Sequence, residues 1–252
     1  MKSDDSPTRR AVLQGAAGAA AVAGIAGSGI GALAAPASAA PGPGPKKEAA
    51  LKKSIEKARA RVETGRRSAN GWSMEKRVDA GGSIWTKKVP GSDVSVALRI
   101  GDAAIVLTHV IRRFHYEIDT LENGDVVGFK PPRLLFEHGW ESNHSSGTAI
   151  DIRPGWYPDG AKGGFFPHEL VTIRDILADC EGAVKWGGDF ATPAESHFQI
   201  DVRPDDALLR KVADKLRGWN AAPGEGAGVL VDVLAPSRRS RADALERRQR
   251  RR

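Results

Sequence analysis

The chain has 252 residues, of which 40% are hydrophobic, enough for one domain of ordinary size with appendages but not for two full cores. Its formal net charge is +7. Most of that charge lies in residues 237–252, where eight arginines stand against Asp243 and Glu246, whereas residues 40–236 are neutral. A neutral folded part argues against a nucleic-acid-binding domain, and we expect no nucleic-acid partner.

Residues 1–39 have the features of an export signal. Arg9 and Arg10 precede a weakly apolar run of alanine and glycine, and Ala37-Ser38-Ala39 offers a small-residue cleavage site. The paired arginines resemble a twin-arginine signal, so we expect a secreted or wall-associated protein. A membrane anchor is the weaker alternative, because leucine is scarce in the run and Pro36 ends it early. We therefore expect no transmembrane span once the signal is removed.

The rest of the chain divides by composition into three parts. Residues 40–80 are a Pro/Gly spacer and a charged segment with only a thin apolar stripe, which we interpret as a linker with a loosely attached helix. Residues 81–220 form the predicted domain. Residues 221–252 are interpreted as a Gly/Arg-rich disordered tail, either without a partner or binding anionic wall polymers. Cys180, the only cysteine, is expected to be a small buried hydrophobe.

Within the predicted domain, strand and helix patterns are mixed without regular βαβ alternation. A hairpin is expected over residues 83–100, with PGSD as its turn. Helical spacing follows from residue 102, from Pro167 and from residue 205, while TAIDIR, GAVKW and HFQIDV are typical of short strands. The predicted fold class is α+β, with a small antiparallel sheet flanked by helices.

Two of the strand patterns carry candidate metal ligands. His144 and Asp151 bracket Gly147, a residue that permits a tight backbone path. Asp151 interrupts an apolar strand, where a carboxylate is costly unless it is paired. In the second strand, alternation places His197 and Gln199 on the same face. Two imidazoles and one carboxylate suit Zn²⁺ and leave its fourth position open for water, as hydrolysis requires.

These residues also carry a family resemblance. The pattern Ser142-x-His144-x-x-Gly147-x-Ala149-x-Asp151, followed by Trp186-Gly187-Gly188-Asp189-Phe190 and His197-Phe198, resembles the zinc D-alanyl-D-alanine carboxypeptidases of the VanY type and their L-alanyl-D-glutamate endopeptidase relatives. The resemblance spans about residues 95–203. It implies the hedgehog/DD-peptidase fold, peptidoglycan stem peptides as substrates, and His144, Asp151 and His197 as the zinc ligands.

The sequence departs from this family at the general base. The family places an acidic residue three positions before the last histidine, where this chain has Ala194, and Glu195 follows it. We predict Glu195 as the catalytic base, with Asp189 in reserve. A carboxypeptidase also needs a cation for the terminal carboxylate of its substrate. Arg113, Arg133 and Arg153 are the candidates, and Ser142 and Arg133 are our predicted substrate-binding residues.

Three functions remain open from sequence. The first is a D,D-carboxypeptidase that releases a terminal D-alanine, and the second is an endopeptidase with the same chemistry. The third is a non-catalytic cell-wall-binding protein that contains zinc, because a shared fold does not guarantee turnover.

Overall fold

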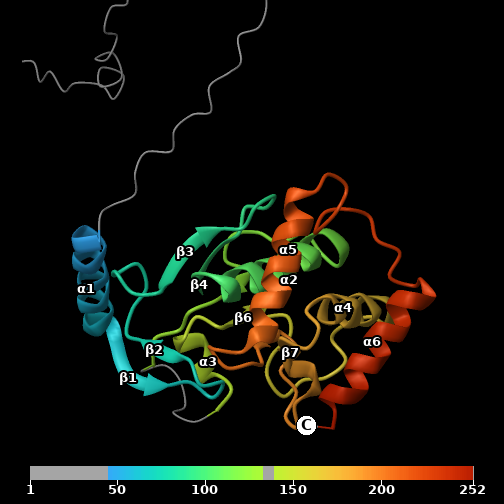
Figure 1. The fold of residues 1–252 in the computed structure, drawn as a ribbon. Coiled ribbons are helices and arrows are strands. Elements are labelled where there is room, and N and C mark those ends of the chain that lie inside the picture. Colours follow the sequence, from blue (N-terminus) through green and yellow to red (C-terminus); the bar gives the residue numbers. More distant parts are fainter. Residues whose placement is uncertain (1–44, 133–138, 252) are drawn as a thin grey trace, which may run out of the picture. The chain divides into compact units, whose positions relative to one another are not determined.

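A computed structural model describes residues 45–132 and 139–251 (Figure 1). Residues 43–252 group into one compact unit. Its helices and small antiparallel sheets confirm the predicted α+β class. The predicted export signal, residues 1–39, lies outside the described residues.

A four-stranded antiparallel sheet positions the predicted metal ligands. Its strand order is β5-β6-β8-β7, formed by β5 (Val126–Val127), β6 (Ala149–Ile152), β8 (His197–Ile200) and β7 (Val184–Trp186). The central strands β6 and β8 are buried along their whole length. Their register pairs Ile150 with Phe198 and Asp151 with His197.

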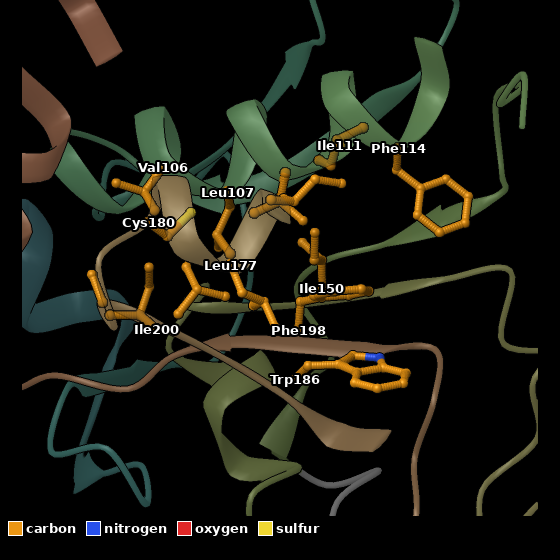
Figure 2. Close-up of a cluster of buried hydrophobic side chains, with 14 of the residues drawn as sticks. Val106, Leu107, Ile111, Phe114, Ile150, Leu177, Cys180, Trp186, Phe198 and Ile200 are labelled. Carbon is orange, nitrogen blue, oxygen red and sulfur yellow. The ribbon is translucent and has the colours of Figure 1, made fainter. Parts of the chain in front are cut away.

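This register separates the core from the site. Residues directly opposite each other in an antiparallel pair point to the same face, and neighbours along a strand alternate. The face with Ile150, Phe198 and Ile200 meets the apolar side chains of two helices, as Figure 2 shows. The opposite face therefore carries Asp151, His197 and Gln199.

The helices on the core face are α2 (Asp102–Glu117) and α4 (Pro167–Asp179). Val106, Val110 and Phe114 follow helical spacing along α2 and are fully buried. Pro167 occupies the first turn of α4, where a missing N–H costs nothing. Helix α5 (Ala207–Ala221), which Asp206 caps through the Leu208 N–H, packs on α2.

The predicted hairpin is present as β3 (Ile84–Lys88) and β4 (Ser95–Arg99), which pair in antiparallel register. Between β4 and α2, Gly101 adopts a positive φ of 94° and ends the strand.

The interpretation of residues 40–80 as a linker is correct only for part of the segment. Helix α1 (Pro45–Val62) is exposed except at Ala58 and Val62, which fits a loosely attached helix. It is followed by a second hairpin, β1 (Glu63–Arg67) and β2 (Ser73–Glu75), in which Met74 and Glu75 are buried. Hydrogen bonds from its turn reach α3 and the end of β8, so this hairpin belongs to the folded unit.

The interpretation of residues 221–252 as a disordered tail is wrong for helix α6 (Pro236–Gln249). This helix packs against α4 and buries Ala242, Leu245 and Gln249. Arg238 forms ion pairs with Asp175 and Asp179 of α4. Arg238 thus neutralises acids that α4 buries.

The structure also bears on Cys180 and on membrane-spanning helices. Cys180 is fully buried and unpaired, and burial raises the pKa of its thiol to about 12, as expected for a structural cysteine. Among the described residues, no helix is both long and apolar enough to cross a membrane.

Candidate metal centre

Three buried side chains converge on the face of the four-stranded sheet that lies opposite the apolar core. His144 comes from the short helix α3 (Ser142–Ser145), Asp151 from β6 and His197 from β8. Between the first two, Gly147 has a φ of +67°, and a Cβ there would lie 2.7 Å from the Arg99 nitrogen. Only glycine fits this turn, which returns the chain from His144 to the strand that carries Asp151. The sequence prediction that Gly147 permits a tight path is confirmed.

The ligand atoms of this cluster lie within 4.8 Å of one another. Asp151 Oδ1 is 3.1 Å from His144 Nε2 and 2.8 Å from His197 Nδ1. The other ring nitrogen of His144, Nδ1, is 2.5 Å from the carbonyl oxygen of Gly128, which can only accept, so Nδ1 carries a proton and Nε2 is the nitrogen available to a metal ion.

The donor set fits a divalent metal ion. The exposed fraction is 0% for both histidines and 4% for Asp151, so the facing ligand atoms lie out of water. A divalent cation can take the place of the protons shared between the carboxylate and the two rings, and two imidazoles with one carboxylate are ligands that zinc accepts in open, catalytic sites. The described residues contain this one group of three or more possible ligands.

Electrostatics favour the metal-binding forms of Asp151 and His197. Burial alone would raise the pKa of Asp151, but its contacts with His144 and His197 outweigh burial and hold the pKa well below its usual range. Burial lowers the pKa of His197, which favours the neutral ring. A carboxylate and neutral imidazoles are the forms that coordinate metals.

Lys130 is a functional candidate that sequence reasoning missed. Its ammonium group donates to Asp151 Oδ2, and its side chain is 31% exposed, so it faces both the cluster and solvent. In the described part of the chain, no other lysine or arginine forms an ion pair with the three ligands. Lys130 stands in the irregular stretch after β5, where no periodic pattern marks it.

Glu195, the predicted base, lies two residues before His197 and is 4% exposed. Its Oε1 and Oε2 accept hydrogen bonds from the main-chain N–H groups of Gly163 and Gly164, each at 2.8 Å. Glu195 therefore anchors the 154–166 loop to the strand of the last ligand. It is not among the groups within 4.8 Å of one another at the metal cluster, and its role as base stays a prediction.

The reserve base, Asp189, has a structural partner instead. Its carboxylate receives two hydrogen bonds from Arg174 of α4 and lies 3.4 Å from Arg250. It is thereby held toward the helices α4 and α6, which satisfy its charge.

The arginine candidates for the substrate carboxylate are occupied as well. Arg113 is 1% exposed and pairs with Asp175, Asp179 and Glu117. Arg153 pairs with Asp119 and Asp125. Both neutralise acids of the fold, so neither is free for a substrate, and Arg133 lies outside the described residues.

Ser142 is also engaged within the fold. It is 1% exposed, and its hydroxyl donates to the Gly139 carbonyl and accepts from the Ala69 N–H. The structure therefore gives Ser142 a role in holding the β1–β2 turn against α3. Its predicted contact with substrate stays a prediction.

Aromatic rings flank the last ligand. The rings of Trp140 and Phe190 have centroids 4.3 Å and 5.9 Å from that of His197, and both residues are half-buried. They form an apolar wall beside the metal centre. Trp186, in contrast, belongs to the core, and Trp156 is exposed.

Comparison with known proteins agrees with this geometry. Residues 137–200 match the model of a family described as D-alanyl-D-alanine carboxypeptidase. No curated protein and no solved structure gives a significant match. The matched segment contains all three converging ligands, which confirms the resemblance seen in the sequence. The site is that of a metallopeptidase of the D-alanyl-D-alanine carboxypeptidase type.

Proposed function

We propose that this protein is an exported zinc peptidase that removes the terminal D-alanine from peptidoglycan stem peptides. The observation that carries the proposal is the buried convergence of His144 Nε2, His197 Nδ1 and an Asp151 oxygen inside the segment that matches the carboxypeptidase family. Three ligands leave one tetrahedral position open, as hydrolytic zinc sites require.

The chain's own residues supply the rest of the site. A zinc ion held by the three ligands would polarise the scissile carbonyl and activate water. Lys130 has a partly exposed side chain, and its ammonium group beside Asp151 is placed to bind the terminal carboxylate of the substrate or the developing negative charge. Trp140 and Phe190 shield one side of His197 from water and offer an apolar surface to an alanine methyl group.

A group must also take a proton from water and pass it to the leaving amine. Glu195 remains our candidate because it is buried two residues before His197. Its hydrogen bonds with the Gly163 and Gly164 N–H groups give it a second role in anchoring the 154–166 loop. An experiment on a Glu195 variant must therefore measure catalysis and stability separately.

Export and wall association belong to the same proposal. Support comes from the paired Arg9 and Arg10 in residues 1–39 and from the nature of the substrate, which is extracellular. Replacing Arg9 and Arg10 with lysine should retain the protein in the cytoplasm, and cell fractionation measures this. Unchanged export of that variant would contradict the twin-arginine route.

The principal test combines metal analysis with product detection. Purified protein should contain about one zinc ion per chain and release D-alanine from a pentapeptide that ends in D-Ala-D-Ala, and His144→Ala should lose both. Zinc without D-alanine release would favour the endopeptidase, to be checked with internal stem-peptide bonds. Zinc without any cleavage would favour the wall-binding protein, and absence of zinc would refute the zinc-peptidase proposal.

A further inference from the structure

A chain of hydrogen bonds leads from the β1–β2 turn to the last metal ligand. The main-chain N–H of Asn70 donates to Asn143 Oδ1 at 3.0 Å. Asn143 Nδ2 donates to Gln199 Oε1 at 2.8 Å, and the same oxygen lies 3.1 Å from His197 Nε2. Asn143 and His197 are 0% exposed and Gln199 is 7% exposed, so the chain lies almost entirely out of water.

The chemistry of each group determines which partner donates in each of these hydrogen bonds. A main-chain N–H only donates, so Asn143 must turn its amide oxygen to Asn70 and its amide nitrogen to Gln199. An amide nitrogen also donates, so Gln199 presents its oxygen. That oxygen can only accept, and His197 must therefore carry its proton on Nε2.

The proton on Nε2 determines which nitrogen of His197 can bind a metal ion. With a proton held on Nε2, Nδ1 is the nitrogen of His197 that can give its lone pair to a metal ion, and this atom faces Asp151 Oδ1 at 2.8 Å. His144 has the opposite arrangement, because the Gly128 carbonyl holds its Nδ1 proton. The two histidines thus offer different nitrogens to one point, each selected by an acceptor behind the ring.

We propose that Asn143 and Gln199 are positioning residues. The Asn70 N–H fixes the orientation of the Asn143 amide, which fixes that of the Gln199 amide, and the Gln199 oxygen then holds a proton on His197 Nε2 and so selects Nδ1 as the metal-binding nitrogen. This inference rests on the metal centre of the proposed function and extends it to a hairpin far away in sequence. Residues 63–75 then belong to the metal-binding unit.

The β1–β2 turn, where this series of hydrogen bonds begins, is itself held firmly. The Asn70 side-chain amide donates to Thr148 Oγ1 at 2.9 Å and to the Ile200 carbonyl at 2.8 Å. The Ala69 N–H donates to Ser142 Oγ at 2.9 Å. These bonds join the turn to β8, to the residue that precedes β6 and to α3, so the Asn70 N–H has a fixed direction relative to Asn143.

Asn143→Asp is the sharpest variant, because it replaces one NH₂ group with oxygen and keeps the shape. An aspartate still accepts from Asn70 but no longer donates to Gln199. Gln199 must then turn its NH₂ group toward both neighbours. That group would donate to His197 Nε2, move the ring proton to Nδ1 and remove the lone pair that binds metal.

Two substitutions at Gln199 form a matched pair. Gln199→Glu keeps an oxygen that accepts from both Asn143 and His197, whereas Gln199→Met keeps the approximate volume and loses the acceptor. We expect Asn143→Asp and Gln199→Met to weaken zinc binding by about 10–100-fold, and Gln199→Glu to stay within about threefold of the unsubstituted protein.

The readouts are zinc affinity of the full chain, measured by competition with a chelator, and the tautomer of His197 in the metal-free protein, measured by long-range ¹H–¹⁵N NMR. Circular dichroism and thermal unfolding establish that each variant is folded. A protonated Nε2 in the unsubstituted protein and in Gln199→Glu, and its loss in Asn143→Asp, would support the proposal.

Failure of this inference can be distinguished from failure of the proposed function. If the unsubstituted protein binds zinc and cleaves peptide, but Gln199→Met binds zinc equally well, the positioning role is refuted while the peptidase stands. If Asn143→Asp does not fold, the comparison of Gln199→Met with Gln199→Glu decides alone. If the unsubstituted protein binds no zinc, both proposals fall.

Discussion

Two side chains close to the ligands have contacts that define what they can do. Glu195 offers each carboxylate oxygen to one main-chain N–H, whereas the Lys130 side chain is 31% exposed while its ammonium group contacts Asp151. The first is held in place by the fold, and the second can reach a substrate. Substitution of each gives a different kinetic signature.

Glu195→Gln should affect both catalysis and stability. As the general base, Glu195 contributes about 10²–10⁴-fold to kcat, and that factor should be lost with zinc retained. Since an amide cannot accept from both Gly163 and Gly164, the free energy of unfolding should also fall by about 1–3 kcal/mol.

The two effects are separated by measuring kcat at a temperature where protein and variant are both folded. A folded Glu195→Gln protein with unchanged kcat would show that Glu195 only anchors the 154–166 loop and that the proton acceptor is another group.

Lys130→Gln should raise KM for a peptide ending in D-Ala-D-Ala. A charge-assisted hydrogen bond contributes about 1.5–3 kcal/mol, which corresponds to an increase of about 10–100-fold. Steady-state kinetics measure the change, with zinc content as a check on Asp151. Lys162→Gln is the control, since that lysine is exposed in the 154–166 loop. Equal KM values for the Lys130 variant and the unsubstituted protein would exclude this role.

Some arginines of the α6 region form ion pairs within the fold, whereas others are exposed to solvent. Arg238 and Arg250 pair with acids of α4 and the β7–β8 connection. Among the described residues, no acid forms an ion pair with Arg241, Arg247, Arg248 or Arg251, which are all exposed. At 3.6 residues per turn Arg241, Arg247 and Arg248, the three that lie within α6, fall in an arc of about 120°. The helix thus presents one basic face, which we propose binds a phosphodiester wall polymer.

This proposal predicts salt-sensitive binding to a glycerol-phosphate polymer. Replacing Arg241, Arg247 and Arg248 with glutamine should weaken binding about tenfold or more at low salt, because guanidinium groups match phosphate and exposed charges are screened by ions. Co-sedimentation with the polymer measures this. The control removes the same charge from α1 by replacing Lys46, Lys53 and Lys57. Equal loss in both triple variants would indicate a nonspecific effect of net charge.

The sequence allowed prediction of the elements whose side chains follow a period. The alternation around His197 and the helical spacing from Asp102 and Pro167 are local patterns, and local patterns determine which face is buried. The three predicted ligands accordingly lie together in the structure. Gly147 was recognisable for a similar reason, since a tight turn needs a residue that tolerates positive φ.

The elements that were missed depend on contacts between distant residues. Helix α6 has almost no apolar stripe, and its attachment relies on Arg238 meeting acids of α4. The β1–β2 turn contacts Thr148 and Ile200 through Asn70. Lys130 meets Asp151 only because β5 pairs with β6. None of these pairings has a spacing that a single sequence reveals.

At the scale of the whole molecule, a buried ion network joins α2, α4 and α6. Arg113 of α2 and Arg238 of α6 both contact Asp175 and Asp179 of α4. Removing one member of such a network leaves a buried charge without its partner, which costs more than the pair contributes. The C-terminal helix therefore stabilises the same unit that holds the metal centre.

The network predicts how stability depends on pH. Burial alone would raise the pKa of Asp179, but its contact with His109 and the charges of Arg113 and Arg238 lower it to about 2, from 3.8 in the unfolded chain. A lowered acid pKa stabilises the fold above the unfolded value, and this contribution is lost as pH falls from about 4 to 2. Its size is about 2 kcal/mol.

Arg238→Gln should make this acid transition shallower. Without that charge the pKa of Asp179 moves back toward 3.8, so the free energy of unfolding is lower at pH 7 and changes less between pH 4 and pH 2. Denaturant unfolding at several pH values measures both effects, with Arg247→Gln on the exposed face as the control. If Arg238→Gln and Arg247→Gln gave the same pH profile, α6 would not be coupled to α4 through Asp179. Its attachment would then rest on its buried residues Ala242, Leu245 and Gln249 and on the Arg174–Glu246 ion pair.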